Sequence, residues 1–280
     1  MKRTGIVFAI LCTLASAGCD TGTHQRLNCI CLIDYSGSLP DQTLRRYVEI
    51  ISSDVLKQMG EWDRLVVLPI DEGAKTEAVT LVNEDFSDNR FSYPSDGYAH
   101  AKDSMLMRLR HYADRNGPKV ASELLREKDL RTRYTYYSDI FSALEQASGL
   151  LERPEPDSFW PRVGRFITGK KKIESTNVII VFSDMIQESS ECSFAGPEGC
   201  TPDAGHAVLE KLKSWHRIPD LQGCTVFVNG RTGKNNLQVE NNKSFWLEYF
   251  KEAHAELAAY DYDSGTLIKP FLKERLMASR

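Results

Sequence analysis

The sequence predicts an α/β domain of three layers, in which a mostly parallel central sheet lies between two layers of helices. Apolar runs of strand length occur at 27–33, 64–70, 177–182 and 224–228. These runs are almost uninterrupted, as expected for strands that are buried on both faces of a parallel sheet. Segments with helical spacing of apolar residues separate the runs, and alternation of strands with helices is typical of a parallel sheet covered on both sides.

Besides the strands already named, the first half of the chain predicts one helix, a short strand and an insertion. A helix is expected to begin at Pro40 and Asp41, because apolar residues then recur at helical spacing. Residues 77–81 predict a short third strand. Residues 87–134 are rich in charge and tyrosine and interrupt the alternation, so we expect a helical insertion there, with a helix over about 99–130.

The second half predicts three more helices and a short final strand. One helix is expected from Ser138 to Leu151, before a proline-containing segment that ends it. The others are expected at about 204–215 and 243–258, followed by the final strand. We therefore place the main domain at 28–268, and we list the remaining segments by position: the insertion 87–134, a cysteine loop 186–203 and a C-terminal tail 269–280.

Residues 1–18 predict a targeting segment. Two basic residues precede the apolar run 5–15, which is too short to span a bilayer comfortably, and small residues follow it. This pattern is typical of a bacterial export signal.

The end of the targeting segment resembles a lipoprotein box, in which a cysteine is acylated and becomes the mature N-terminus. The matching residues are Ser16-Ala17-Gly18-Cys19, and Ser16 stands where such a box usually has leucine. The resemblance implies lipidation of Cys19, a short tether over 19–27, and a place on a membrane surface in the cell envelope, periplasmic in a Gram-negative cell. A plain membrane anchor is the alternative.

The net charge excludes a broad nucleic-acid-binding surface. The chain carries a formal charge of −4. The targeting segment contains Lys2 and Arg3 but no acid, so the net charge of the mature chain would be more negative. A nucleic-acid-binding domain would show an excess of basic residues. We expect no nucleic-acid partner.

The cysteines predict one disulfide and a set of buried thiols. Cys192 and Cys200 flank a turn-rich segment that could close into a small ring in an oxidising compartment. Cys29, Cys31 and Cys224 lie in apolar runs, which favours buried thiols over metal ligands. Cys29 and Cys31 share one face of a strand and could reach Cys224 only if their two strands are neighbours.

Two acids directly follow the most buried strands, Asp34 after the first and Asp184 after the fourth. Ligand sites of parallel sheets lie at the carboxyl ends of the strands, where these loops converge. Buried acids are costly unless they are paired or coordinated, so this pair predicts a cation. Ser36 and Ser38 add hydroxyl oxygens, and hard oxygen ligands suit Mg²⁺, with Mn²⁺ or Ca²⁺ as alternatives.

The motifs Asp34-x-Ser36-x-Ser38 and Phe182-Ser183-Asp184, each after an apolar strand, resemble the metal-ion-dependent adhesion site of von Willebrand factor A (VWA) domains. That family also takes a Thr or Ser from a loop between the two motifs, five residues ahead of a small residue followed by Leu or Ile. Ala143-Leu144 puts this position at Ser138, and Thr135 is an alternative three residues earlier. The resemblance implies a doubly wound, Rossmann-like fold and a bacterial VWA-domain lipoprotein.

The resemblance also implies how the site would act. Ser36, Ser38 and Ser138 would contact the metal directly, and Asp34 and Asp184 directly or through water. An open coordination position would take an acidic side chain from a partner protein. One departure bears on the shape of the last loop, because Met185 stands where the family often has glycine.

Other interpretations of the same residues stay open. Asp34 or Ser36 could cap the helix that follows, and Asp184 the next one, as Asp139 is expected to do for its own helix. A metal-dependent hydrolase would need more carboxylates or histidines near the two acids than the sequence offers, so we expect a binding protein and no enzyme. An envelope scaffold with a vestigial metal site is a further alternative. Four aromatic residues at helical spacing are expected in the core: Trp215, Trp246, Tyr249 and Phe250.

Overall fold

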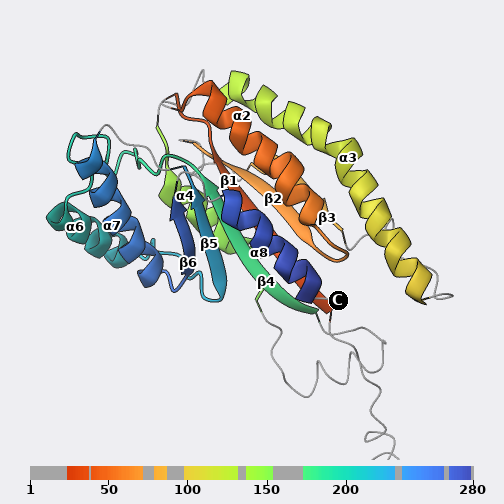
Figure 1. The fold of residues 1–280 in the computed structure, drawn as a ribbon. Helices are drawn as coiled ribbons and strands as arrows, with labels where there is room; N and C mark the ends of the chain where they lie inside the picture. The colour runs from red at the N-terminus through yellow and green to blue at the C-terminus, as the bar shows by residue number, and fades with distance from the viewer. Residues whose placement is uncertain are drawn as a thin grey trace, which may run out of the picture.

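The computed structural model describes residues 24–37, 39–71, 79–86, 98–131, 137–153, 173–230, 235–261 and 265–278. Within these residues a six-stranded sheet has the strand order β3-β2-β1-β4-β5-β6 and carries helices on both sides (Figure 1). The predicted α/β class, with its mostly parallel sheet and three layers, is confirmed.

All neighbouring strands of the sheet are parallel except β2 and β3, which are antiparallel. The strands are β1 (His24–Asp34), β2 (Arg64–Ile70), β3 (Val82–Asp85), β4 (Ile173–Phe182), β5 (Cys224–Asn229) and β6 (Glu256–Asp261). The four long apolar runs each lie in a strand, as predicted.

The third strand is displaced from its predicted position at 77–81. It begins only at Val82, and Val82 pairs with Val67 of β2 in the antiparallel register. The connection from β2 is too short for the crossover that a parallel strand needs, so the chain turns back and β3 forms the edge of the sheet.

The helices occupy most of the predicted segments. They are α2 (Asp41–Glu49), α3 (Tyr98–Arg131), α4 (Ile140–Gly149), α6 (Pro202–Ser214), α7 (Asn236–Glu252) and α8 (Gly265–Ala278). The first of these continues as a π-helical turn over Ile50–Val55 and a 3₁₀ turn over Leu56–Gln58. The inserted helix predicted at 99–130 is confirmed as α3. None of the described helices combines the length and apolar character that crossing a bilayer requires.

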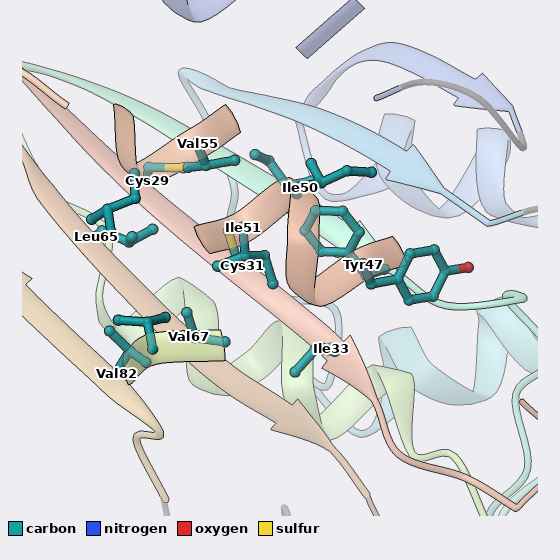
Figure 2. Close-up of a cluster of buried hydrophobic side chains, with 14 of the residues drawn as sticks. Cys29, Cys31, Ile33, Tyr47, Ile50, Ile51, Val55, Leu65, Val67 and Val82 are labelled. Carbon is teal, nitrogen blue, oxygen red and sulfur yellow. The ribbon is translucent and has the colours of Figure 1, made fainter. Parts of the chain in front are cut away.

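Side chains of β1 alternate between two cores, one on each face of the sheet. Cys29, Cys31 and Ile33 face α2, α3 and α8, and Figure 2 shows part of this core. Ile30 and Leu32 face α4, α6 and α7 on the other side. All five side chains are fully buried. Burial on both faces explains why the sequence of this strand is an almost uninterrupted apolar run.

The cysteines of the strands are buried free thiols, as predicted. In the sheet, β4 lies between β1 and β5. Cys29 and Cys31 are therefore not on a strand next to that of Cys224, and Cys29 packs in the core on the opposite face from Cys224. Contact between Cys224 and the two thiols of β1 required neighbouring strands, and the strand order does not meet this condition.

Both predicted ends of the helix at 243–258 are wrong, because α7 spans Asn236–Glu252. It begins earlier because the side chain of Asn235 caps it, accepting a hydrogen bond from the Gln238 N–H at 2.9 Å. It ends at Glu252, and His254 then adopts a left-handed φ of 59°. Ala258 belongs to β6, where it is the extra residue at a register shift, and its neighbours Leu257 and Ala259 pair with β5.

The predicted domain boundaries also need correction. β1 begins at His24 and Leu27 is 7% exposed, so the segment 19–27 is not wholly a tether. At the other end, the expected tail 269–280 forms most of α8, and Leu272 is fully buried against the sheet. The targeting segment and Cys19 lie outside the described residues, so export and lipidation stay predictions.

Asp63 makes the stability of the fold depend on pH. Its buried carboxylate accepts hydrogen bonds from Leu27 N at 2.7 Å and Gly60 N at 2.6 Å, tying the start of β2 to β1. Burial nevertheless raises its pKa to about 6, against the lowering effect of these bonds and of Arg26. A carboxyl group in an unfolded chain titrates near ~3.9, so the folded state holds this proton more tightly. The proton on Asp63 therefore stabilises the folded state. This contribution to the free energy of unfolding is complete below pH ~4 and is lost as the pH rises through about 6.

We expect Asp63→Asn to remove this pH dependence. The variant gives up one of the two backbone hydrogen bonds at every pH, because its amide N–H₂ cannot accept. Relative to the variant, the wild type should lose about 3 kcal/mol of unfolding free energy between pH ~4 and ~7. Urea unfolding of both proteins across this range measures the difference. A difference that does not change with pH would contradict the raised pKa.

Candidate metal centre

The predicted site residues lie where the direction of winding of the sheet reverses. From β1 the chain continues to β2 on one side, whereas β4, β5 and β6 follow one another on the other side. β1 and β4 are neighbours, and Ile33 pairs with Phe182 just before the two strands end. Loops at such a switch point diverge and leave room for a ligand at the carboxyl ends of the strands.

The Asp34 carboxylate stands at the centre of the site and is fully buried. Its Oδ1 accepts a hydrogen bond from Ser36 N at 2.8 Å. The Ser138 hydroxyl donates to both carboxylate oxygens at 3.2 Å, and the Ser183 hydroxyl donates to Oδ2 at 2.8 Å. The structure thus brings together Asp34, Ser36 and Ser138, which were predicted from separate parts of the sequence. Ser38 and the alternative Thr135 lie outside the described residues.

Asp184 lies at the same edge of the sheet, on the loop that follows β4. Its Oδ1 accepts a hydrogen bond from Ile186 N at 2.9 Å, and its side chain is largely buried. Met185 adopts a left-handed backbone with a φ of 61°, although its side chain is fully buried. This conformation costs a non-glycine residue about 1–2 kcal/mol. The loop therefore keeps a glycine-like backbone, and Trp246 Nε1 holds it by donating to Met185 O at 2.9 Å.

Helix capping does not explain the two strand-end acids. The N-cap of α2 is Pro40, without a side-chain cap, and the N-cap of α6 is Thr201. Asp139 does cap α4, as predicted, and accepts from Ser142 N at 3.3 Å. The capping interpretation thus holds for Asp139 and fails for Asp34 and Asp184.

The electrostatic environment of Asp34 fits a cation. Burial raises the pKa of this carboxyl group, and the hydrogen bonds from Ser36, Ser183 and Ser138 offset only part of the effect. Within the described part of the chain, the partners of this carboxylate are N–H and O–H groups and none is a basic side chain. A buried charge without an opposite charge is costly. A metal ion would supply that opposite charge.

The donor set selects the type of ion. Among the described residues, no group of three or more His, Cys, Asp or Glu side chains could hold a metal. Any ion here would depend on hydroxyl oxygens beside the carboxylates. Such oxygen ligands suit Mg²⁺ or Mn²⁺, which retain water molecules. They do not suit zinc, which prefers nitrogen and sulfur ligands.

Ser183 is a site residue that was not among the predicted ligands, although it lies in the motif Phe182-Ser183-Asp184. Its hydroxyl donates to Asp34 and also accepts a hydrogen bond from Met185 N at 3.0 Å. The alternation of side chains along β4 was the available signal. Phe182 enters one core, so Ser183 must face the other side of the sheet, where Asp34 lies.

The chain matches no protein-family model and no curated protein. Among solved structures it is similar to an aerotolerance-related membrane protein from Bacteroides fragilis, with 11% identity over 90% of this chain and 99% of that chain and a TM-score of 0.37. It is also similar to the conserved hypothetical protein BatB from Bacteroides thetaiotaomicron, with 13% identity over 90% and 98% of the two chains and a TM-score of 0.41. Likenesses at this level carry no argument about family or function, which rests on the site itself.

The cysteine loop is held without the expected disulfide. Cys192 and Cys200 are free thiols, and burial raises the pKa of each to about 12. Side-chain amides of α7 bind the backbone of the loop instead. Gln238 donates to Phe194 O at 3.2 Å and to Gly196 O at 2.8 Å. Three asparagines make further bonds of this kind: Asn235 to Pro197 O, Asn241 to Glu198 O, and Asn242 from Cys200 N.

The inserted helix α3 reaches the site through Tyr35, which stands between Asp34 and Ser36. The buried hydroxyl of Tyr35 donates to the backbone oxygen of Leu124 in α3 at 3.0 Å. Two ion pairs fix the same end of the helix, Lys128 with Asp41 and Arg131 with Asp71. The insertion therefore supports the loop that carries Asp34 and Ser36.

Three of the four aromatic residues expected in the core are fully buried: Trp246, Tyr249 and Phe250. The prediction is wrong for Trp215, which is 46% exposed. Trp215 follows the last turn of α6, and Lys211 Nζ lies 4.5 Å from the centre of its ring. The cation–π contact with Lys211 covers part of its ring in place of core packing.

Proposed function

We propose that this chain is a VWA-type binding protein of the bacterial envelope that takes up Mg²⁺ and binds a partner protein presenting an acidic side chain. Asp34, Ser36, Ser138 and Asp184 would hold the ion, together with Ser38. The observation that carries the proposal is the buried Asp34 carboxylate, which accepts hydrogen bonds from the hydroxyl of Ser138, just before α4, and from the hydroxyl of Ser183, just after β4. A bound Mg²⁺ would supply an open coordination position for the carboxylate of the partner.

The donor set supports binding over hydrolysis. An ion that activates water usually has several histidine and carboxylate ligands, with a general base nearby. The described residues offer no group of three or more His, Cys, Asp or Glu side chains that could hold a metal, so hydroxyl groups would have to supply part of the ligand set. Neutral hydroxyls leave much of the charge of the ion uncompensated, which favours recruitment of a carboxylate from another molecule.

The direction of β1 supports a partner away from the membrane. This strand is 11 residues long, so Asp34 lies about 33 Å from the start of the strand at His24. Lipidation of Cys19 would attach the chain to the bilayer only a few residues before His24. The metal edge would then face the aqueous compartment, where it could meet a soluble domain of a partner.

One observation favours a second candidate function, an envelope scaffold with a vestigial metal site. The Asp34 carboxylate accepts hydrogen bonds from Ser36, Ser138 and Ser183, and such bonds can satisfy a buried carboxyl group in place of a cation. Pull-down from solubilised membranes with and without EDTA separates the two candidates. The metal-dependent binding protein loses its partner on chelation, whereas the scaffold keeps it.

We expect Asp34→Ala to abolish stabilisation by Mg²⁺. At Mg²⁺ concentrations 100-fold above its dissociation constant, binding stabilises the folded state by ~2.7 kcal/mol, which corresponds to roughly 5–10 °C in melting temperature. Melting curves in MgCl₂ and in EDTA measure this shift.

Asp63→Asn is the matched control for Asp34→Ala. Asp63 is another largely buried acid, but it lies before β2, at the opposite edge of the sheet. This control should keep the Mg²⁺ shift of the wild type. If Asp34→Ala keeps the same shift as well, the ion does not bind at this site.

A further inference from the structure

We propose that Gln187 is a positioning residue of the metal centre, which sets the separation between the loop of Ser138 and the loop of Asp184. The inference rests on the proposed function and assigns a role to a residue outside the predicted ligand set. Gln187 lies three residues after Asp184 and its side chain is fully buried.

Three hydrogen bonds join the two ligand loops. The Glu188 N–H donates to Ser138 O at 3.0 Å. The Ile140 N–H donates to Gln187 Oε1 at 2.8 Å, and Gln187 Nε2 donates to Asp139 Oδ1 at 3.2 Å. These bonds connect residues 187–188 to residues 138–140. The two loops therefore move together and not independently.

The Gln187 side chain uses both ends of its amide in this connection. Ile140 is the first residue of α4, where a backbone N–H has no partner within the helix. Asp139 presents an acceptor. Of the uncharged side chains of this length, only glutamine can accept from the first group and donate to the second. An apolar residue of similar volume would fill the space and break both bonds.

The network of hydrogen bonds around Asp139 continues away from the metal centre. The Ser142 hydroxyl donates to Asp139 Oδ2 at 2.7 Å, and Arg217 Nη2 donates to Ser142 Oγ at 3.0 Å. Arg217 also pairs with Glu145 of α4 at 2.7 Å and with Glu191 of the cysteine loop. The network thus ties the cysteine loop and α4 to the same two ligand loops.

A metal centre whose ligands lie on separate loops needs those loops at a defined distance. Ser138 directly precedes Asp139, and Asp184 shares its loop with Gln187. Partners that orient ligands in this way typically contribute ~10–100-fold to metal affinity. Gln187 and Asp139 together hold the donors on either side of the ion.

The test is a Mg²⁺ titration of the purified chain by calorimetry, comparing the wild type with Gln187→Met. We expect the dissociation constant for Mg²⁺ to rise by about 10–100-fold. Gln187→Leu serves as a second variant of similar volume if the first does not fold.

Gln238→Met is the matched control. Gln238 is equally buried and also binds the cysteine loop, but it lies on α7, and its amide donates to the backbone oxygens of Phe194 and Gly196. Both variants should lower the melting temperature in EDTA, whereas only the Gln187 variants should lower Mg²⁺ affinity.

The possible outcomes separate this inference from the proposed function. If the wild type binds Mg²⁺ and the Gln187 variants bind it equally well, the positioning role is wrong and the metal site stands. An equal loss of affinity in Gln238→Met would show general loosening of the cysteine loop and would also overturn it. If the wild type does not bind Mg²⁺ at all, the proposed function fails and this inference with it.

Discussion

Replacing Asp34 with asparagine is expected to raise the melting temperature in EDTA and to abolish the rise that Mg²⁺ produces in the wild type. The carboxylate is fully buried, and burial raises its pKa, so its charge opposes folding when no cation is bound. Asparagine has the same shape without the charge. The hydroxyls of Ser138 and Ser183 can rotate, so each can accept from the new amide or donate to its oxygen.

The expected stabilisation of Asp34→Asn in EDTA is roughly 1–3 kcal/mol, because replacing a buried charge by a neutral group is often stabilising. Asp203→Asn, which changes an exposed acid in the first turn of α6, should leave the response to Mg²⁺ unchanged and should lower the stability in EDTA by at most about 1 kcal/mol. Melting curves of the three proteins in EDTA and in MgCl₂ provide the comparison. Destabilisation of Asp34→Asn in EDTA would mean that the buried charge is already compensated.

Replacing Gly230 with alanine is expected to destabilise the fold and to disturb the metal centre. Gly230 follows β5 with a φ of 129°, a backbone that other residues rarely adopt. A Cβ atom there would lie 2.5 Å from Ser183 O and would also collide with the Tyr47 hydroxyl. Either the β5 loop or Ser183 must move. Because Ser183 donates to Asp34, the second response changes the site directly.

We expect Gly230→Ala to cost about 2–6 kcal/mol, as the sum of backbone strain and overpacking. Gly223→Ala is the control, since Gly223 also has a positive φ of 75° but no atom lies within 4 Å of its added Cβ. That change should cost only about 1–2 kcal/mol. Urea unfolding measures both values. Equal costs for the two variants would show that the contact with Ser183 imposes no constraint.

Hydrophobic pattern and spacing predicted most of the sheet and the location of the site. The run at 178–182 is apolar throughout because β4 is buried on both faces in the middle of the sheet. Asp34 and Asp184 were predicted to share an edge because parallel strands end on the same side. The resemblance to VWA domains, through the spacing ahead of Ala143-Leu144, selected Ser138, whose hydroxyl contacts Asp34 from a position 104 residues away.

Features that depend on tertiary contacts could not be predicted in this way. Nothing local marks Gln187 as the partner of Asp139 and Ile140, because its role exists only when the two loops meet. Met185 has a left-handed backbone that its residue type disfavours, and surrounding contacts such as that with Trp246 stabilise it. The end of α7 was missed for the same reason, since the residues on either side of Ala258 pair with β5 and place it within a strand.

The central claim is that a divalent ion binds between the ends of β1 and β4. Anomalous diffraction from crystals of the protein grown with saturating Mn²⁺ tests it most directly, because it locates the ion without reference to activity. We predict one strong peak beside Ser36, Ser138 and Asp184. An ordered site without a peak, or a peak found only elsewhere on the protein, would contradict the claim.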